Sequence, residues 1–292
     1  MAVLNNNTQV AEFLSGLDHP EGIAWGLNGK IYAGGEAGQI YEISFQEKSM
    51  KQLASVGDGF VAGLALDANS NIYACDVGNA NIQKITPEGK VTPYSAGNNE
   101  YPFRIPNYPV FDSSGNLYVS DSGEFTEGIP SLNGNICKIK PGGNEAEIWE
   151  NSLNDFPNGM CMDPTNNYLY VVLSFNQPGI YRIPILSNGT AGKVETVLNL
   201  PKIGVVPDGI AFDQEDNLYI SCYRPDRIYR LKKNGQLEIF AEELTGHVIS
   251  APTNIAFCGE KREKLISSNL GRWHLTEYET TIPGISLNYP TI

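Results

Sequence analysis

Hydrophobic and polar residues alternate along this chain in short runs, and one pattern of such runs recurs six times. Each copy starts with an apolar strand, passes a turn rich in Asn, Asp and Gly, and continues as an alternating strand, as in VPDGIAFDQEDNLYISC from Val206. A third and a fourth strand follow in most copies. No segment keeps a period of 3.6 residues, so we expect almost no helix.

The third residue of each copy marks the repeat, and we call these six positions the markers. They are Glu21, Ala62, Asn107, Asn158, Asp208 and Thr253, separated by 41, 45, 51, 50 and 45 residues. A period of roughly 40 to 50 residues is the length of one four-stranded propeller blade. The spacing predicts an all-β, six-bladed β-propeller formed by residues 1–292 as one domain. A β-sandwich with similar hairpins is the alternative, but a sandwich does not require a constant period.

The ring must also be closed. Only five segments can serve as the fourth strand after a third strand, whereas the remaining candidate, TQVAEFL at residues 8–14, precedes the first marker. We therefore expect this amino-terminal strand to complete the last blade, which contains residues 251–279.

Composition narrows the possible partners and the compartment. The 292 residues carry a net charge of −13 and no basic cluster, which argues against nucleic acid and acidic membranes as partners. The sequence shows neither a signal peptide nor an 18-residue apolar run, so we expect a cytoplasmic protein. The five cysteines are widely spaced and form no CxxC pair, which fits free thiols. Cys161 stands where other copies have Ala, and we interpret it as a small core residue.

The markers carry the candidate chemistry. The innermost strands of a propeller line its channel, so equivalent positions at their starts should form a ring. Four markers are oxygen donors, namely Glu21, Asn107, Asn158 and Asp208, and their charge of −2 would balance one divalent cation. Calcium suits irregular oxygen ligands best, magnesium and manganese are possible, and zinc is less favoured because no His or Cys joins the ring.

A simpler interpretation is that these residues only shape turns. Asn158-Gly159 and Asp208-Gly209 are common turn dipeptides. Turn formation does not explain Glu21, which is not a favoured turn residue, or Asn107, which is followed by Tyr108.

The phrases PEG, PNG and PDG at these positions of a six-fold repeat resemble the senescence marker protein (regucalcin), gluconolactonase and luciferin-regenerating enzyme family. The resemblance implies that Glu21, Asn158 and Asp208 bind one divalent cation, with Asn107 a further ligand or just outside. It also implies lactonase activity, with Asp208 as the acid/base residue. A small lactone would then be the substrate.

The same resemblance directs attention to the loops near the channel mouth. Relatives often have an Arg near Arg104 that contacts substrate, although a solvated loop Arg is the plainer interpretation. Asp121 opens a long segment, DSGEFTEGIPSLNGN, which could cap the site and which contains Glu124; ordered rim loops without a function are the alternative. We expect Arg104, Asn107, Asp121 and Glu124 to contact substrate.

A cation open to the channel could polarise a lactone carbonyl while Asp208 takes a proton from the attacking water. Two other functions fit the same ring. The site could hydrolyse organophosphate esters, as diisopropylfluorophosphatase does on a similar scaffold, or the ion could be structural in a propeller whose rim binds a partner. Activity toward a panel of lactones before and after chelation separates these functions.

Overall fold

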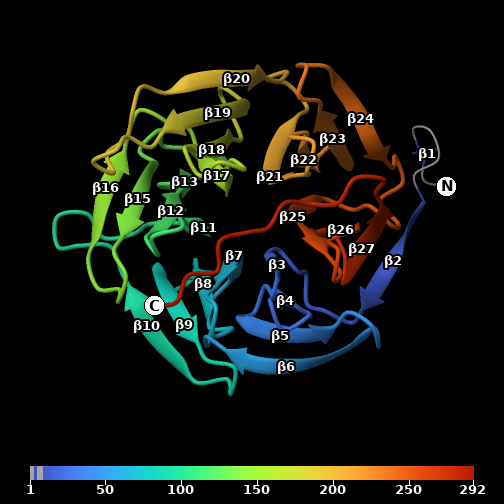
Figure 1. Ribbon diagram of the computed structural model, residues 1–292, viewed down its shortest axis with the longest axis horizontal. Helices are drawn as coiled ribbons and strands as arrows, with labels where there is room; N and C mark the ends of the chain where they lie inside the picture. Colours follow the sequence, from blue (N-terminus) through green and yellow to red (C-terminus); the bar gives the residue numbers. More distant parts are fainter. Residues whose placement is uncertain (1–2, 5–8) are drawn as a thin grey trace.

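In the computed structural model, which describes residues 3–4 and 9–292, six antiparallel sheets surround a central channel (Figure 1). This confirms the predicted all-β, six-bladed propeller. The described residues include no helix, and therefore none long and apolar enough to span a membrane.

Each blade has four main strands, numbered outward from the channel in chain order. The first blade contains β3 (Ile23–Trp25), β4 (Lys30–Gly34), β5 (Gln39–Ser44) and β6 (Ser49–Ser55). The second contains β7 (Val61–Leu66), β8 (Ile72–Asp76), β9 (Asn81–Ile85) and β10 (Val91–Ser95). The third contains β11 (Pro106–Phe111), β12 (Leu117–Asp121), β15 (Asn135–Ile139) and β16 (Ala146–Glu150).

The remaining blades continue this order. The fourth contains β17 (Pro157–Met162), β18 (Tyr168–Leu173), β19 (Gly179–Pro184) and β20 (Glu195–Asn199). The fifth contains β21 (Val206–Phe212), β22 (Leu218–Arg224), β23 (Arg227–Leu231) and β24 (Leu237–Glu242). The sixth contains β25 (Pro252–Cys258), β26 (Lys264–Asn269) and β27 (His274–Glu279), with β2 (Val10–Ser15) as its outer strand.

The recurrent Asp-containing turn fixes the hairpin between the first two strands of a blade. In the second blade, Asp67 Oδ1 accepts hydrogen bonds from the backbone N–H groups of Asn69 and Asn71, each at 2.9 Å. Asp213 caps the corresponding turn of the fifth blade in the same way. A buried carboxylate at this position is stabilised by these backbone donors, which explains why the repeat keeps an Asp there.

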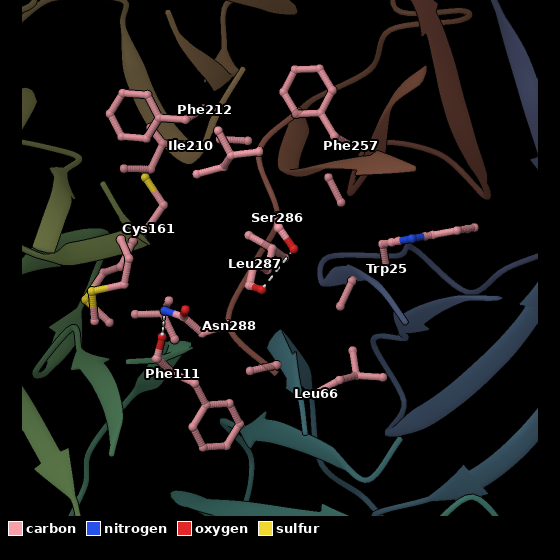
Figure 2. A pocket seen from close by; sticks show the side chains of 18 of the residues that line it. Trp25, Leu66, Phe111, Cys161, Ile210, Phe212, Phe257, Ser286, Leu287 and Asn288 are labelled. Carbon is pink, nitrogen blue, oxygen red and sulfur yellow. Dashed lines mark hydrogen bonds between the residues drawn. The ribbon is translucent and has the colours of Figure 1, made fainter. Parts of the chain in front are cut away.

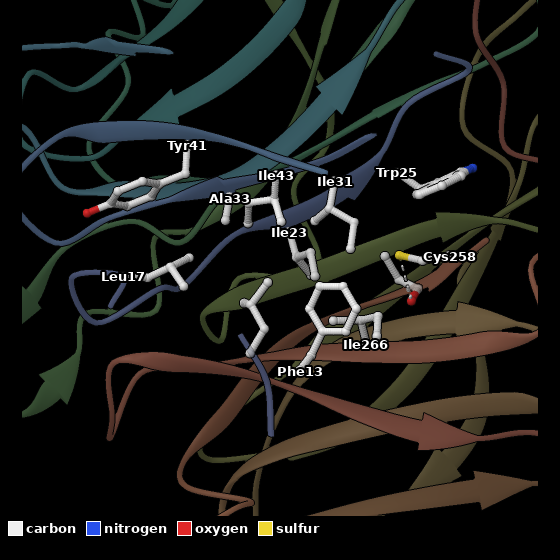
Figure 3. Close-up of a cluster of buried hydrophobic side chains, with 12 residues drawn as sticks. Phe13, Leu17, Ile23, Trp25, Ile31, Ala33, Tyr41, Ile43, Cys258 and Ile266 are labelled. Carbon is white, nitrogen blue, oxygen red and sulfur yellow. Dashed lines mark hydrogen bonds between the residues drawn. The ribbon is translucent and has the colours of Figure 1, made fainter. Parts of the chain in front are cut away.

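The amino-terminal segment closes the ring as predicted. Strand β2 pairs antiparallel with β27, with Val10 opposite Tyr278 and Ser15 opposite His274. Phe13 of β2 is 3% exposed and joins a core cluster shared by the first and last blades (Figure 3). Thr8, the first residue of the predicted strand, lies outside the described residues. Strand β1 (Val3–Leu4) pairs with β24 and so adds a fifth strand to the fifth blade.

A segment that the repeat does not predict crosses the channel after the last strand. Residues 283–292, which we call the C-terminal strap, run over the end of the channel where the inner strands finish (red in Figure 1). The strap forms hydrogen bonds with all six blades: with Trp25, Ala68, Phe111, Asn166, Phe212 and Arg262. It therefore closes the channel on the face opposite the markers.

Candidate metal centre

The markers lie at the starts of the inner strands and form a continuous ring. Thr253 Oγ1 donates directly to the carbonyl of its neighbour Glu21 at 2.9 Å, and Ser120 Oγ of the third blade donates to the Asn158 carbonyl of the fourth at 2.8 Å. The four oxygen-donor markers, Glu21, Asn107, Asn158 and Asp208, are 5%, 6%, 3% and 6% exposed. The structure thus buries the predicted ligand set in one ring at the channel.

The glycines after the markers allow this close approach. A Cβ on Gly159 would lie 2.3 Å from the carbonyl oxygen of Asp208, and one on Gly22 would lie 1.9 Å from that of Ala62. Gly159 and Gly209 lie inside β17 and β21, not in turns. The turn interpretation of these dipeptides is therefore wrong, because the glycines serve packing between neighbouring inner strands.

Two acidic side chains interact inside this ring. Burial raises the pKa of Glu21 well above its usual range, and the nearby charge of Asp208 raises it further. Burial also raises the pKa of Asp208 to about 7, although a hydrogen bond from Asn158 opposes this shift. No Lys or Arg forms an ion pair with either carboxyl group within residues 3–4 and 9–292. Two carboxyl groups in such surroundings favour either protonation or a bound cation.

Three buried oxygen atoms of the ring have no hydrogen-bond partner among the described residues. Asn107 Oδ1, Asn158 Oδ1 and Asp208 Oδ1 are buried and accept no hydrogen bond from any residue that the structure describes. Buried polar atoms in proteins almost always have a partner, and an orphaned atom calls for an explanation. Together with the Glu21 carboxylate, these atoms form an all-oxygen donor set, which is what calcium, magnesium and manganese prefer. The residues present therefore fit a divalent cation.

The sixth blade contributes a residue that the repeat analysis did not identify. Asn254 follows the marker Thr253, where four other blades have Gly, and its Nδ2 donates to Glu21 Oε2 at 3.1 Å. Asn254 is fully buried, and its Oδ1 has no partner among the described residues. The sequence signal for this residue is the break in the marker-Gly pattern at Asn254.

Serines on or just after the second strands form hydrogen bonds with the ring, and the repeat did not predict this role. Ser174 Oγ accepts from Asn158 Nδ2 at 3.2 Å and donates to the Pro207 carbonyl of the next blade at 2.8 Å. Ser268 Oγ donates to the Glu21 carbonyl, and Ser221 Oγ donates to the Thr253 carbonyl. Each hydroxyl therefore connects the second strand of one blade to the inner strand of the next.

Comparison with known proteins assigns the chain to a family. The sequence profile described as SMP-30/Gluconolactonase/LRE-like region matches residues 90–268, more than half of the chain. The chain belongs to the SMP-30/gluconolactonase/LRE-like family. No curated protein sequence matches it.

Solved structures support the same fold. A gluconolactonase from Xanthomonas campestris has a TM-score of 0.78 at 17% identity, covering 95% of this chain and 91% of that one. A luciferin-regenerating enzyme has a TM-score of 0.78 at 17% identity, with 98% and 100% covered. The calcium-binding regucalcin from Agrobacterium tumefaciens str. C58 has a TM-score of 0.75 at 17% identity, with 96% and 95% covered. At such identities the likeness shows the fold alone.

In this family member, Arg104 and Glu124 meet at the rim. Arg104 Nε lies 3.5 Å from Glu124 Oε1, and its Nη1 donates to the Tyr101 hydroxyl at 2.5 Å. Glu124 is followed by a small hairpin of β13 (Phe125–Thr126) and β14 (Ile129–Pro130). The long segment after Asp121 is thus an ordered loop.

Asp121 is buried, unlike Arg104 and Glu124, which lie at the rim. It is fully buried, and its Oδ1 accepts from the N–H groups of Ile105 and Gly123 while its Oδ2 accepts from the N–H of Arg104. Its geometry is that of a residue holding the loop that carries Arg104. Contact of Arg104, Asn107, Asp121 or Glu124 with a substrate remains a prediction.

Proposed function

We propose that this protein is a cation-dependent lactonase that opens a small lactone ring by hydrolysis. The observation that carries the proposal is a buried ring of two interacting carboxyl groups and two amides, in which Asn107 Oδ1, Asn158 Oδ1 and Asp208 Oδ1 accept no hydrogen bond from any described residue. Membership of a family that includes gluconolactonases supports the reaction class.

Glu21, Asn158 and Asp208 would hold the cation, with Asn107 as a fourth ligand or just outside the ligand shell. Calcium is the first candidate because it tolerates irregular oxygen ligands, and magnesium, manganese or zinc are the others. When bound, the cation would supply Lewis-acid polarisation of the ester carbonyl and stabilise negative charge on its oxygen.

Asp208 is our candidate for the acid/base residue. Its Oδ1 accepts no hydrogen bond from any described residue, so one carboxylate oxygen could bind the cation while the other accepts a proton from water. Burial raises the pKa of Asp208 to about 7 in the absence of a cation, and a bound cation would lower it. Asp208 therefore acts as the base only if the cation also acidifies the attacking water or one carboxylate oxygen stays free.

Arg104 and Glu124 at the rim would contact the polar atoms of the substrate. A guanidinium donates hydrogen bonds, whereas a carboxylate accepts them, so the pair can bind a ligand with both kinds of group. Asp121 would hold the loop that carries Arg104, because its oxygens accept three backbone N–H groups, and its own contact with the substrate stays a prediction.

The test is base uptake with a panel of lactones, measured before and after chelation and again after each divalent cation is restored. We expect hydrolysis of at least one lactone, loss on chelation and recovery with calcium. Glu21→Gln should lower cation affinity, whereas Glu12→Gln, the same change on an exposed residue of β2, should not. Turnover that survives chelation would refute cation dependence, and no turnover with any lactone would refute the reaction class.

A further inference from the structure

The channel contains a second feature, away from the metal centre. At the end closed by the strap, the inner strands and the strap enclose a cavity of about 350 Å³, which we call the channel chamber (Figure 2). Its walls come from all six blades, and the strap residues Ile285, Leu287 and Tyr289 form part of its lining.

Small or medium-sized side chains at one repeated position of the inner strands leave this space open. The residue three positions after each marker lines the chamber, and it is small or medium-sized in every blade: Ala24, Ala65, Val110, Cys161, Ala211 and Ala256. Cys161 is 5% exposed, which confirms its interpretation as a buried residue, and it lies in the channel wall. The side chains on either side of these positions, such as Ile210 and Phe212, are large and apolar and also contribute to the lining.

Two polar side chains at the chamber wall, Asp163 and Asn288, already form hydrogen bonds within the protein. Asp163 accepts hydrogen bonds from the N–H groups of Thr165, Asn167 and Tyr168 in its own turn. Asn288 of the strap donates to the Phe111 carbonyl at 2.9 Å. A molecule in the chamber would therefore meet mainly aliphatic and aromatic surface.

Tyr108 marks the boundary between the chamber and the metal centre. Its side chain lines the chamber, while the charges of Glu21 and Asp208 add to burial in raising the pKa of its hydroxyl. The chamber is not lined by any of the four oxygen-donor markers, Glu21, Asn107, Asn158 and Asp208. The two spaces are therefore neighbouring but distinct parts of one channel.

We infer that the channel chamber is a binding site for a neutral, largely apolar small molecule, such as one aromatic ring with a short alkyl chain. Protein interiors are close-packed, and voids much larger than a water molecule are rare. This void falls within the range of ligand pockets, roughly 300 to 1,000 Å³, and such pockets are mostly apolar. Apolar cavities in proteins bind benzene-like molecules and xenon. The inference does not rest on the proposed lactonase function.

Bromobenzene is a direct probe, and titration calorimetry measures its binding to the folded protein. We expect saturable binding to the unaltered protein. Adding Ala65→Leu and Ala211→Leu should fill the chamber and raise the Kd by about tenfold or more. Ala11→Leu, the same change on an exposed residue of β2, should leave the Kd unchanged.

Two further measurements test whether binding is independent of the metal centre and whether it occurs in the chamber. The Kd for bromobenzene should be equal in chelated and calcium-saturated protein, because the chamber lies outside the metal centre. If the filled variant does not fold, xenon-pressurised crystals of the unaltered protein should show a xenon peak among Ala65, Cys161 and Ala211. No saturable binding, the same Kd in the filled variant, loss of binding on chelation, or no xenon in the chamber would each overturn the inference.

Discussion

Asn254 Nδ2 donates to Glu21 Oε2 at 3.1 Å, across the junction between the last blade and the first. The two residues are 233 positions apart in the chain, so this contact exists only when the ring is closed. The Thr253 and Ser268 hydroxyls reach the Glu21 carbonyl across the same junction. Glu21, one of the candidate ligands, therefore reaches its position only when the propeller closes.

Removing the Asn254 amide should weaken cation binding without unfolding the protein. Hydrogen bonds to charged groups contribute about 1.5 to 3 kcal/mol, so Asn254→Leu should raise the Kd for calcium by about 10- to 100-fold. Titration calorimetry measures this, with Asn99→Leu on the surface as the matched control. An unchanged Kd in a folded Asn254→Leu protein would show that Glu21 needs no such support.

Closure by β2 should be essential for stability. Phe13 is 3% exposed, and its ring lies 5.6 Å from that of Phe45. Truncating a buried Phe usually costs about 3 to 5 kcal/mol, so Phe13→Ala should lower the free energy of unfolding by this amount. Denaturant unfolding measures the change. A loss below about 1 kcal/mol would mean that the outer strand of the last blade is dispensable.

Gly159→Ala should damage both the packing and the metal centre. The added Cβ would lie 2.3 Å from the Asp208 carbonyl oxygen, so the two inner strands must separate. Overpacking typically costs about 1 to 3 kcal/mol, and here it also displaces a candidate ligand. We expect lower stability together with weaker calcium binding. Gly57→Ala, at a φ of 92° in open space, should lose only stability; equal calcium affinity in both variants would contradict the role of Gly159.

Cation binding should depend on pH in a defined direction. The pKa values of Glu21 and Asp208 are raised in the folded protein, so the folded state binds more protons than the unfolded chain between about pH 4 and pH 7. Without a cation, the melting temperature should therefore fall as the pH rises from 5 to 8. Calcium requires ionised carboxylates, so its stabilising effect should be larger at pH 8 than at pH 5.

The control for this pH effect is the double variant Glu21→Gln/Asp208→Asn. It removes both titrating groups, and the fall of the melting temperature with pH should become smaller. Asp121 and Asp226 also have raised pKa values, so part of the fall should persist. A calcium effect that is equal at both pH values would contradict the assignment of these two carboxylates as ligands.

Much of this architecture could be predicted from the repeat. The recurrence of the markers every 41 to 51 residues required six similar units, and the unpaired strand at residues 8–14 required closure of the last blade. Both features depend on local patterns of strands and turns, which a single sequence displays directly. The burial of Glu21, Asn107, Asn158 and Asp208 in one ring followed from the symmetry of the propeller.

Features without a repeated signal could not be predicted. Asn254 contacts Glu21 because the ring closes, and nothing near Asn254 in the chain indicates that partner. The strap is a single non-repeating segment whose hydrogen bonds reach six different blades. The engagement of Asp121 with backbone N–H groups depends on the path of its loop, which composition does not determine.

The measurement that tests the account most directly is lactone turnover by Asp208→Asn at saturating cation, so that occupancy of the metal centre is not the variable. The substitution keeps an oxygen in place but removes the proton acceptor. Loss of a positioned general base costs about 10²- to 10⁴-fold in rate, and we predict a fall in kcat of that size. If Asp208→Asn hydrolyses the same lactone as fast as the parent protein, Asp208 is not the base and the proposed mechanism is wrong.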